Sequence, residues 1–407
     1  ALPISEKEQI LTAANFTAHR SPERFIYRGL SLNSRHIDWH MFSEVSMRQY
    51  MKDEIRERLQ MIRDTAESAD GRCITPSHET LLHLAAGLGE VQLLNRLLQR
   101  HADPNVQIIL PQQAFPSIPD SEQGNTPLTY ACQPGMDDST PLPVHNRLSC
   151  LNLLIQYGAD VNKPGPLGWP PLVITCVAGI GGAPYEEAAL FLLKCGADIS
   201  LQPELKGKKT SLLTWAAAAG YPLLVRKLCE AGYDPNFRGE MAPPLLSLNL
   251  NTPNAALQIA HILLEYGADV NAAMPASTTL PETAGDTALL NLCRQLAFID
   301  VSSLPQIRDL VNLFIKEGAD VNHQNAAGET PLMACCRGML LGDDSLDRLK
   351  LGIARLLLDH HANPSLKDKY GRTALQRIGN RSNEHLQMVL KYLPELSAPP
   401  LPKKENH

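Results

Sequence analysis

The sequence predicts an all-α solenoid in which short helical hairpins repeat along the chain and stack on one another. Three observations predict this fold class. A five-residue phrase recurs seven times, a second phrase precedes most of its copies, and segments between the two have apolar residues at three- and four-residue spacing. Because a single hairpin cannot enclose a core, such repeats must bury their apolar faces against their neighbours.

The recurring phrase reads Gly-Ala-Asp-Val-Asn in its most regular form, as at Gly158 to Asn162. Its first residue suits the left-handed conformation that ends a helix, and its Asp and Asn favour a turn. Consecutive copies lie 35 to 57 residues apart, so the spacing varies. The seven copies occupy residues 101–105, 158–162, 196–200, 232–236, 267–271, 318–322 and 361–365.

The second phrase is represented by Gly124-Asn125-Thr126-Pro127-Leu128. Its Thr is suited to cap a helix, and Pro is tolerated at the first helical position because its missing N–H needs no partner there. Each repeat is therefore predicted as a helix, a turn, a second helix and a finger loop. Further copies lie at 79–86, 285–289, 328–332 and 371–375, and weaker ones, recognised by register, at 169–172, 209–212 and 242–245.

These two phrases resemble the ankyrin repeat, whose signature is T-P-L-H-x-A over about 33 residues. The resemblance covers roughly four-fifths of the chain and implies a stack of helix-turn-helix units. Spacings above about 33 residues predict insertions, which in repeat proteins form loops, often on the binding side. We expect them at 106–121, 133–143, 272–283, 298–303 and 338–344.

We predict three segments in the chain. Residues 77–396 form an ankyrin array of about seven to eight repeats with insertions. Residues 1–76 form a helical N-terminal cap, because a terminal repeat must be shielded from water and 47–69 carries a helical pattern. Residues 397–407 form a flexible C-terminal tail.

Composition favours some partners and locations over others. The chain of 407 residues has 37 Lys+Arg against 43 Asp+Glu and no long basic block, so nucleic acid is not an expected partner. No apolar run approaches the ~20 residues of a membrane span. The first residues lack a secretory signal pattern, and nine cysteines without a C-x-x-C pair indicate reduced thiols. We expect a cytoplasmic location.

No catalytic residue, cofactor or metal site is predicted. His36 and His40 have the i, i+4 spacing of two zinc ligands, but no third ligand accompanies them. The glycine run at 179–182 lacks the Lys and the preceding strand of a phosphate loop. Four cysteines share one position in the first helix of their repeats, which favours a small buried side chain over a nucleophile. They are Cys132, Cys176, Cys293 and Cys336.

The resemblance implies that fingers and the exposed side of each first helix bind a protein partner. The matching candidates are Glu79, Asn125, Trp169, Asp286, Glu329 and Arg372 before the helix-capping position, Gln133, Arg294 and Arg337 after the first helix, and Leu167 beside Trp169. Each polar candidate can also be ordinary solvated surface. Trp169 is either an interface aromatic, a type enriched in hot spots, or is packed inside its own irregular turn.

The leading functional hypothesis is a non-enzymatic scaffold, monomeric alone, that binds a protein of unknown identity on its concave face and finger loops. Two alternatives stay open. In the first alternative, the N-terminal segment acts as an enzyme or recruits one, through His36, Asp38, His40 and Cys73. By analogy with divergent ankyrin arrays, the chain is a bacterial effector that acts on a host protein in the host cytosol.

Overall fold

The computed structural model describes most of the repeat array, and the chain divides into two compact parts, residues 1–203 and 204–407. The predicted N-terminal cap at 1–76 and the tail beyond residue 397 lie outside the described residues, so the three-segment organisation stays a prediction. The described residues are 80–108, 124–133, 144–165, 168–180, 185–200, 204–205, 208–209, 211–237, 242–275, 283–296, 304–337, 344–378 and 389–397.

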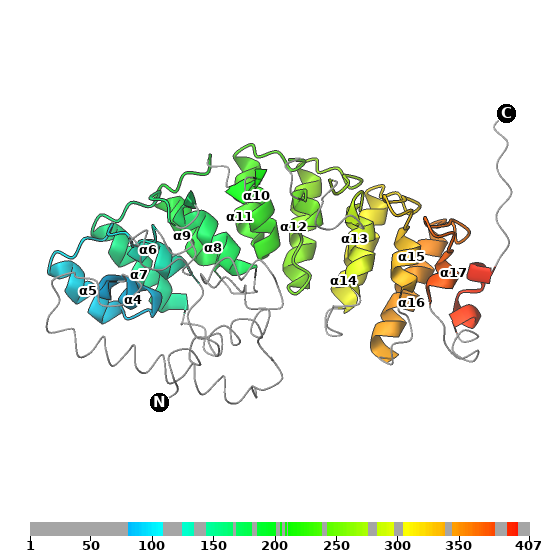
Figure 1. The fold of residues 1–407 in the computed structure, drawn as a ribbon, viewed down its shortest axis with the longest axis horizontal. Helices are drawn as coiled ribbons and strands as arrows, with labels where there is room; N and C mark the ends of the chain where they lie inside the picture. The colour runs from blue at the N-terminus through cyan, green and yellow to red at the C-terminus, as the bar shows by residue number, and fades with distance from the viewer. Residues whose placement is uncertain are drawn as a thin grey trace, which may run out of the picture. The chain divides into compact units, whose positions relative to one another are not determined.

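The described residues of the first part form three helical hairpins (Figure 1). The first helices α4, α6 and α8 pack in one row, and the second helices α5, α7 and α9 pack in another. Leu94, Leu151 and Leu192 of the second helices are fully buried between the rows. The bounds are α4 Leu81–Gly87, α5 Val91–Gln99, α6 Pro127–Cys132, α7 Val144–Gln156, α8 Pro171–Gly179 and α9 Glu186–Lys194.

The second part continues the same pattern after a two-residue antiparallel ribbon, in which Glu204 pairs with Lys209. Helices α11, α12, α14 and α16 pack in succession, and so do α10, η3, α13, α15 and α17. The predicted all-α solenoid of stacked hairpins is confirmed. The bounds are β1 Glu204–Leu205, β2 Lys208–Lys209, α10 Leu212–Ala219, α11 Pro222–Glu230, η3 Pro244–Leu246, α12 Pro253–Glu265, α13 Ala288–Gln295, α14 Leu304–Lys316, α15 Pro331–Cys336, α16 Asp344–Asp359, α17 Ala374–Arg377 and η7 Pro394–Ser397.

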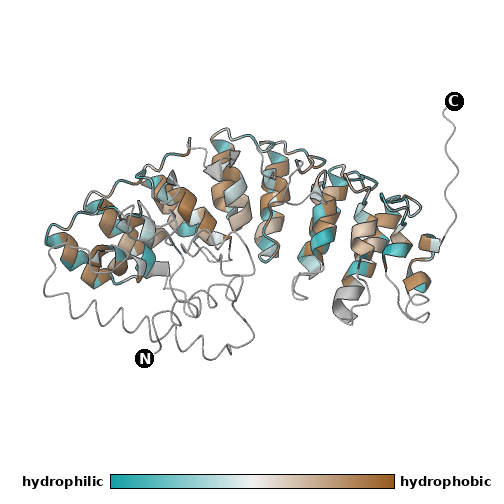
Figure 2. Cartoon of the chain, viewed as in Figure 1, coloured by the Kyte–Doolittle hydropathy of each residue, from teal (hydrophilic) through white to brown (hydrophobic). Residues whose placement is uncertain are grey.

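The first helices begin where the capping phrase predicts. The Thr126 hydroxyl accepts the N–H of Thr129 at 3.2 Å, and the Thr330 hydroxyl accepts that of Met333 at 3.2 Å. The following Pro occupies the first helical position in both helices. These helices are largely apolar, whereas the described loops between repeats are mostly hydrophilic (Figure 2).

Repeat five departs from the prediction, because its first helix is reduced to the single 3₁₀ turn η3. The Asn249 side-chain oxygen accepts the N–H of Asn251 at 3.1 Å, and the Asn249 main-chain carbonyl accepts the Thr252 hydroxyl at 3.2 Å. Such local bonds compete with helix continuation. A helical pattern alone does not reveal this competition.

Two buried cations cap the short first helices that precede insertions. Arg147 of α7 donates to the carbonyl oxygens of Ala131 and Gln133 at the end of α6. Lys350 of α16 donates to the Arg337 carbonyl at the end of α15, at 3.3 Å. A cation near the C-terminus of a helix satisfies its last carbonyls and its negative dipole end. The chain can therefore leave the helix after six residues and enter an insertion.

The glycine of the recurring phrase takes the predicted left-handed conformation, with φ of 92° at Gly158 and 87° at Gly267. His101 and His361 hold the same position in the first and seventh copies, with φ of 64° and 68°. A residue other than glycine is strained in the left-handed conformation, which costs about 1–2 kcal/mol of conformational energy. The fold accepts this cost at both histidines.

Where the phrase ends in asparagine, that residue links its repeat to the next one. The Asn271 amide donates to the Gly318 carbonyl at 3.0 Å, and its oxygen accepts the Asp320 N–H at 2.8 Å. Asp269 in turn accepts the Asn271 N–H at 2.9 Å, which holds the linking residue in its turn. We call this pattern the asparagine ladder. Its linking residues are Asn105, Asn162, Asn236, Asn271 and Asn322.

We expect Asn271→Ala to lower the free energy of unfolding by about 1–3 kcal/mol, because it removes two inter-repeat hydrogen bonds. Urea unfolding followed by circular dichroism measures the change. Ser365→Ala is the matched control, because in the last copy the main-chain N–H of Ser365, not its side chain, bonds to Asn363 at 3.0 Å. Equal losses in the two variants would contradict a stabilising role for the ladder.

Candidate protein-binding surface

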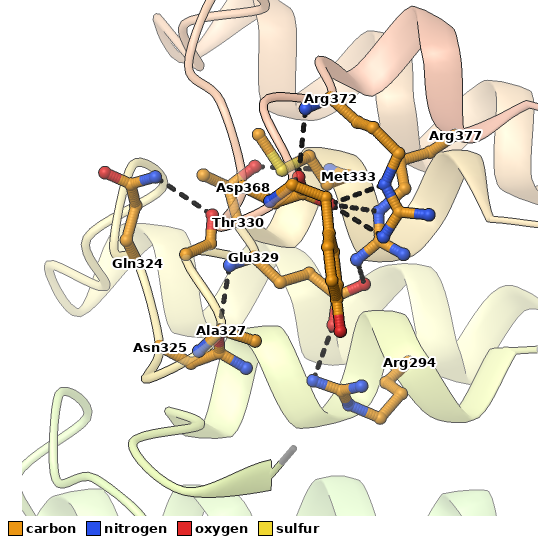
Figure 3. Close-up of polar contacts among 12 residues, drawn as sticks. Arg294, Gln324, Asn325, Ala327, Glu329, Thr330, Met333, Asp368, Arg372 and Arg377 are labelled. Atoms are coloured by element: carbon orange, nitrogen blue, oxygen red, sulfur yellow. Dashed lines mark hydrogen bonds and ion pairs between the residues drawn. The ribbon is translucent and has the colours of Figure 1, made fainter.

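Six charged side chains from repeats six, seven and eight form one chain of alternating sign. Arg294 on α13 lies 2.6 Å from Glu329, and Glu329 in turn contacts Arg377 on α17 at 2.5 Å (Figure 3). At one end, Arg294 pairs with Asp286 at 3.0 Å. At the other end, Arg377 lies 3.4 Å from Asp368, which also binds Arg372 at 2.9 Å (Figure 3). We call these six side chains the charge network.

The carboxylates of the charge network are buried, whereas its three arginines differ in exposure. The side chains of Asp286, Glu329 and Asp368 are 2% exposed or less, whereas that of Arg372 is 42% exposed. Buried carboxylates are stable only when ion pairs and hydrogen bonds compensate for their lost hydration. The side chains of Arg294 and Arg377 are 16% and 12% exposed, so the network fixes two largely buried arginines and one, Arg372, at the surface.

Asn325, which adjoins the charge network, and Asp368, which belongs to it, hold the finger turns. Asn325 donates to Asp286 at 2.7 Å. The Asn325 side-chain oxygen accepts the N–H groups of Ala327 and Glu329, both at 2.9 Å (Figure 3). Asp368 accepts the Arg372 N–H in the same way, at 2.9 Å. The sequence prediction omitted Asn325, Asp368 and Arg377. For Asn325 and Asp368 a signal was present, since each stands four residues before a predicted candidate.

Burial and hydrogen bonding move the pKa values of two network carboxyls in opposite directions. Burial raises the pKa of Asp286 above its ordinary value, although Asn325 and Arg294 oppose this shift. Burial also acts to raise the pKa of Asp368, but the hydrogen bonds from Arg372 and Tyr370 outweigh it and lower that pKa.

The other predicted candidates occupy different environments. The buried Asn125 side chain accepts a hydrogen bond from the Gln133 amide at 3.1 Å, so these two candidates pair within repeat two. Trp169 is 3% exposed, which agrees with packing inside its turn and leaves little of the indole for a partner. Arg337 is exposed. Glu79 and Leu167 lie outside the described residues.

The four cysteines predicted to be buried core residues are buried, and that prediction is confirmed. Burial raises the pKa of Cys132 to about 11 and those of Cys293 and Cys336 to about 12, and it raises that of Cys176 further. Thiols that stay protonated at neutral pH are poor nucleophiles and poor metal ligands.

The described residues contain neither a metal-binding cluster nor a membrane-spanning helix. No group of three or more His, Cys, Asp or Glu side chains there is arranged to hold a metal ion. None of the helices in the described part is both long and apolar enough to cross a membrane.

The model of the ankyrin-repeat family matches residues 82–203 and 299–398, which is more than half of the chain. The chain belongs to the ankyrin-repeat family. Ankyrin repeats are protein-interaction modules, and the array described above has the stacked hairpins and finger turns of that family.

Individual relatives are similar over shorter stretches. A putative ankyrin repeat protein of Acanthamoeba polyphaga mimivirus, L86, is 29% identical over 39% of this chain. The human protein phosphatase 1 regulatory subunit 27 is 41% identical over 12% of the chain, and the putative ankyrin repeat protein YahD of Escherichia coli is 37% identical over 17%. The matched segments span 27%, 30% and 33% of these relatives, so the likeness covers a third of each or less.

We expect Arg294→Ala and Arg377→Ala each to lower the free energy of unfolding by about 1–3 kcal/mol, because each removes a cation from the buried Glu329. The double variant should lose more than the sum, since only then does Glu329 lack both arginines. Urea unfolding in a double-mutant cycle measures the coupling.

The matched control is Arg355→Ala, because Arg355 also has two carboxylate partners but is 46% exposed. Its exposed pairs predict a loss below about 1 kcal/mol. Additive losses at Arg294 and Arg377, within about 0.3 kcal/mol, would show that Glu329 does not couple the two arginines.

The pH dependence of unfolding should change in opposite directions for two substitutions. The lowered pKa of Asp368 means that its stabilisation is present above its unfolded pKa of about 3.9 and is lost as the pH falls. Asp368→Asn should therefore flatten the acid-side loss of stability. The raised pKa of Asp286 means that its protonation favours the folded state as the pH falls, and that this contribution is lost as the pH rises. Asp286→Asn removes the contribution and should therefore steepen the loss of stability at acidic pH. Urea midpoints from pH 3 to 7 test both signs, and slopes that change in the same direction would refute the assignment.

Proposed function

We propose that this ankyrin-repeat chain is a non-enzymatic scaffold that binds a protein partner along its finger turns and the exposed sides of its first helices. The observation that carries the proposal is the charge network. Its three buried carboxylates fix Arg294 and Arg377, which are largely buried, and Arg372, whose side chain is 42% exposed, before any partner arrives. A surface that is ordered in advance loses little conformational entropy on binding.

The candidate contact residues follow from exposure and position. Arg337 lies at the end of α15 and Arg372 in the finger before α17, and both guanidinium groups can reach a partner. Gln133 and Arg294 are half-buried at the ends of α6 and α13. Asn125, Asp286 and Glu329 support the surface from beneath rather than contact the partner.

We further propose that the chain works in a reducing compartment such as the cytoplasm. All eight cysteines in the described part of the chain are free thiols. The likeness to the phosphatase regulatory subunit spans 51 residues, less than two repeats of this array, so protein phosphatase 1 is one partner to test rather than a preferred one.

We expect capture from eukaryotic and bacterial lysates with the full chain to yield a stoichiometric protein that Arg337→Glu reduces at least about tenfold. Lys316→Glu is the matched control, because Lys316 is an exposed cation at the end of a second helix. Protein phosphatase 1 is probed in the same material. Loss of the partner in both variants, or in neither, would contradict a site at the ends of the first helices.

The same preparation distinguishes the scaffold from its alternatives. If removal of residues 1–70 abolished an activity while the array kept its helical signal, the N-terminal segment would carry the function. A partner that comes only from the eukaryotic lysate of a host would favour the effector hypothesis.

A further inference from the structure

The finger of repeat eight, residues 367–372, concentrates positive charge at the surface. Lys367 and Lys369 are exposed, and the Arg372 side chain is 42% exposed. The only carboxylate in this finger, Asp368, has its side chain buried against Arg372 and Arg377. The outer surface of the finger is therefore cationic, although the whole chain has a formal net charge of −6.

The same finger exposes an aromatic ring. Tyr370 is 66% exposed, more than any other large hydrophobic side chain in the described part of the chain. Two cations lie close to its ring, with the Lys369 Nζ atom 5.0 Å and the Arg372 Cζ atom 4.7 Å from the ring centre. Tyr and Arg, together with Trp, are the residue types most enriched among those that dominate the binding energy of protein interfaces.

The finger is ordered in advance by bonds that lie beneath these side chains. Asp368 Oδ1 accepts the N–H groups of Tyr370 and Arg372, each at 2.9 Å. The Lys369 N–H donates to the Ala327 carbonyl of the preceding finger at 2.9 Å. The exposed ring and its cations therefore lie on a fixed turn that is hydrogen-bonded to its neighbour.

We propose that this finger binds an acidic segment of the partner protein. The inference rests on the proposed function and names the chemistry of the partner. Carboxylates of the segment pair with Lys367, Lys369 and Arg372, while the Tyr370 ring contributes an apolar contact that excludes water from those pairs. Single-stranded nucleic acid also uses cations and aromatic stacking, but it needs a cationic track along its backbone. Here the cations are confined to one turn of an acidic chain, which favours a short carboxylate-rich segment.

The test selects peptides from a random 16-residue display library on the full chain and measures their affinity by fluorescence anisotropy. Selected peptides should be enriched in Asp and Glu. They should lose at least about tenfold in affinity for the Lys369→Glu/Tyr370→Ala variant, whose substitutions leave Asp368 and the main-chain bonds in place. Their affinity should also fall as the salt concentration rises.

The matched control is Lys391→Glu/Tyr392→Ala. Lys391 is exposed and Tyr392 is 61% exposed, so the control changes an equivalent pair outside the finger. Selected peptides should bind this variant as they bind the unaltered chain. Thermal unfolding of all three proteins checks that each retains its fold.

Peptides without an acidic excess, or peptides that bind the finger variant and the unaltered chain equally, would overturn the inference. Retention of a random single-stranded RNA pool by the finger, without acidic peptides, would overturn it in favour of nucleic acid. Such a failure is distinct from failure of the proposed function. A protein partner from lysate that binds the finger variant normally would leave the scaffold in place and remove only this contact.

Discussion

The asparagine ladder is the constraint on which the rest of the array depends. A solenoid has no central core, so each repeat must be aligned with its neighbour by contacts between the two alone. The side-chain amide of Asn provides both a donor and an acceptor in fixed geometry. At Asn236 it bonds to the Gly267 carbonyl at 2.8 Å and to the Asp269 N–H at 2.6 Å. This alignment places consecutive helices close enough to bury their apolar faces.

The ladder also explains how the array tolerates large insertions. The phrase at the end of each repeat aligns the repeats, so an insertion elsewhere does not disturb that alignment. The insertion must only keep the buried polar groups at its two ends hydrogen-bonded. Two main-chain hydrogen bonds close the base of the finger insertion after repeat one. The Ile108 N–H donates to the Asn125 carbonyl, and the Gly124 N–H donates to the Ile108 carbonyl, both at 2.9 Å. Between the helices of repeats two and seven, Arg147 and Lys350 satisfy the helix end instead.

Much of the fold was predictable from sequence because the ladder residues repeat. The phrase that predicted the repeats contains the glycine, aspartate and asparagine that make the bonds of the ladder. The η3 turn of repeat five was not predictable in this way, since its cause is the local bonding of Asn249. The candidate surface was only partly predictable. Asp286, Arg294, Glu329 and Arg372 were identified by register, but register does not show that their side chains bind one another.

The sequence does not show which side chains form ion pairs across repeats. These ion pairs decide which residues stay exposed and can contact a partner. Carboxylates next to the helix starts, such as Glu329, were expected to be candidates because that position borders the surface in an ankyrin repeat. The structure turns the Glu329 side chain inward, where two arginines compensate for its burial. The same arrangement at Asp368 orders a finger whose outer face carries Lys369 and Tyr370. Stability and the proposed recognition thus have a common origin, because the buried acid that stabilises the turn also leaves its exposed surface positively charged.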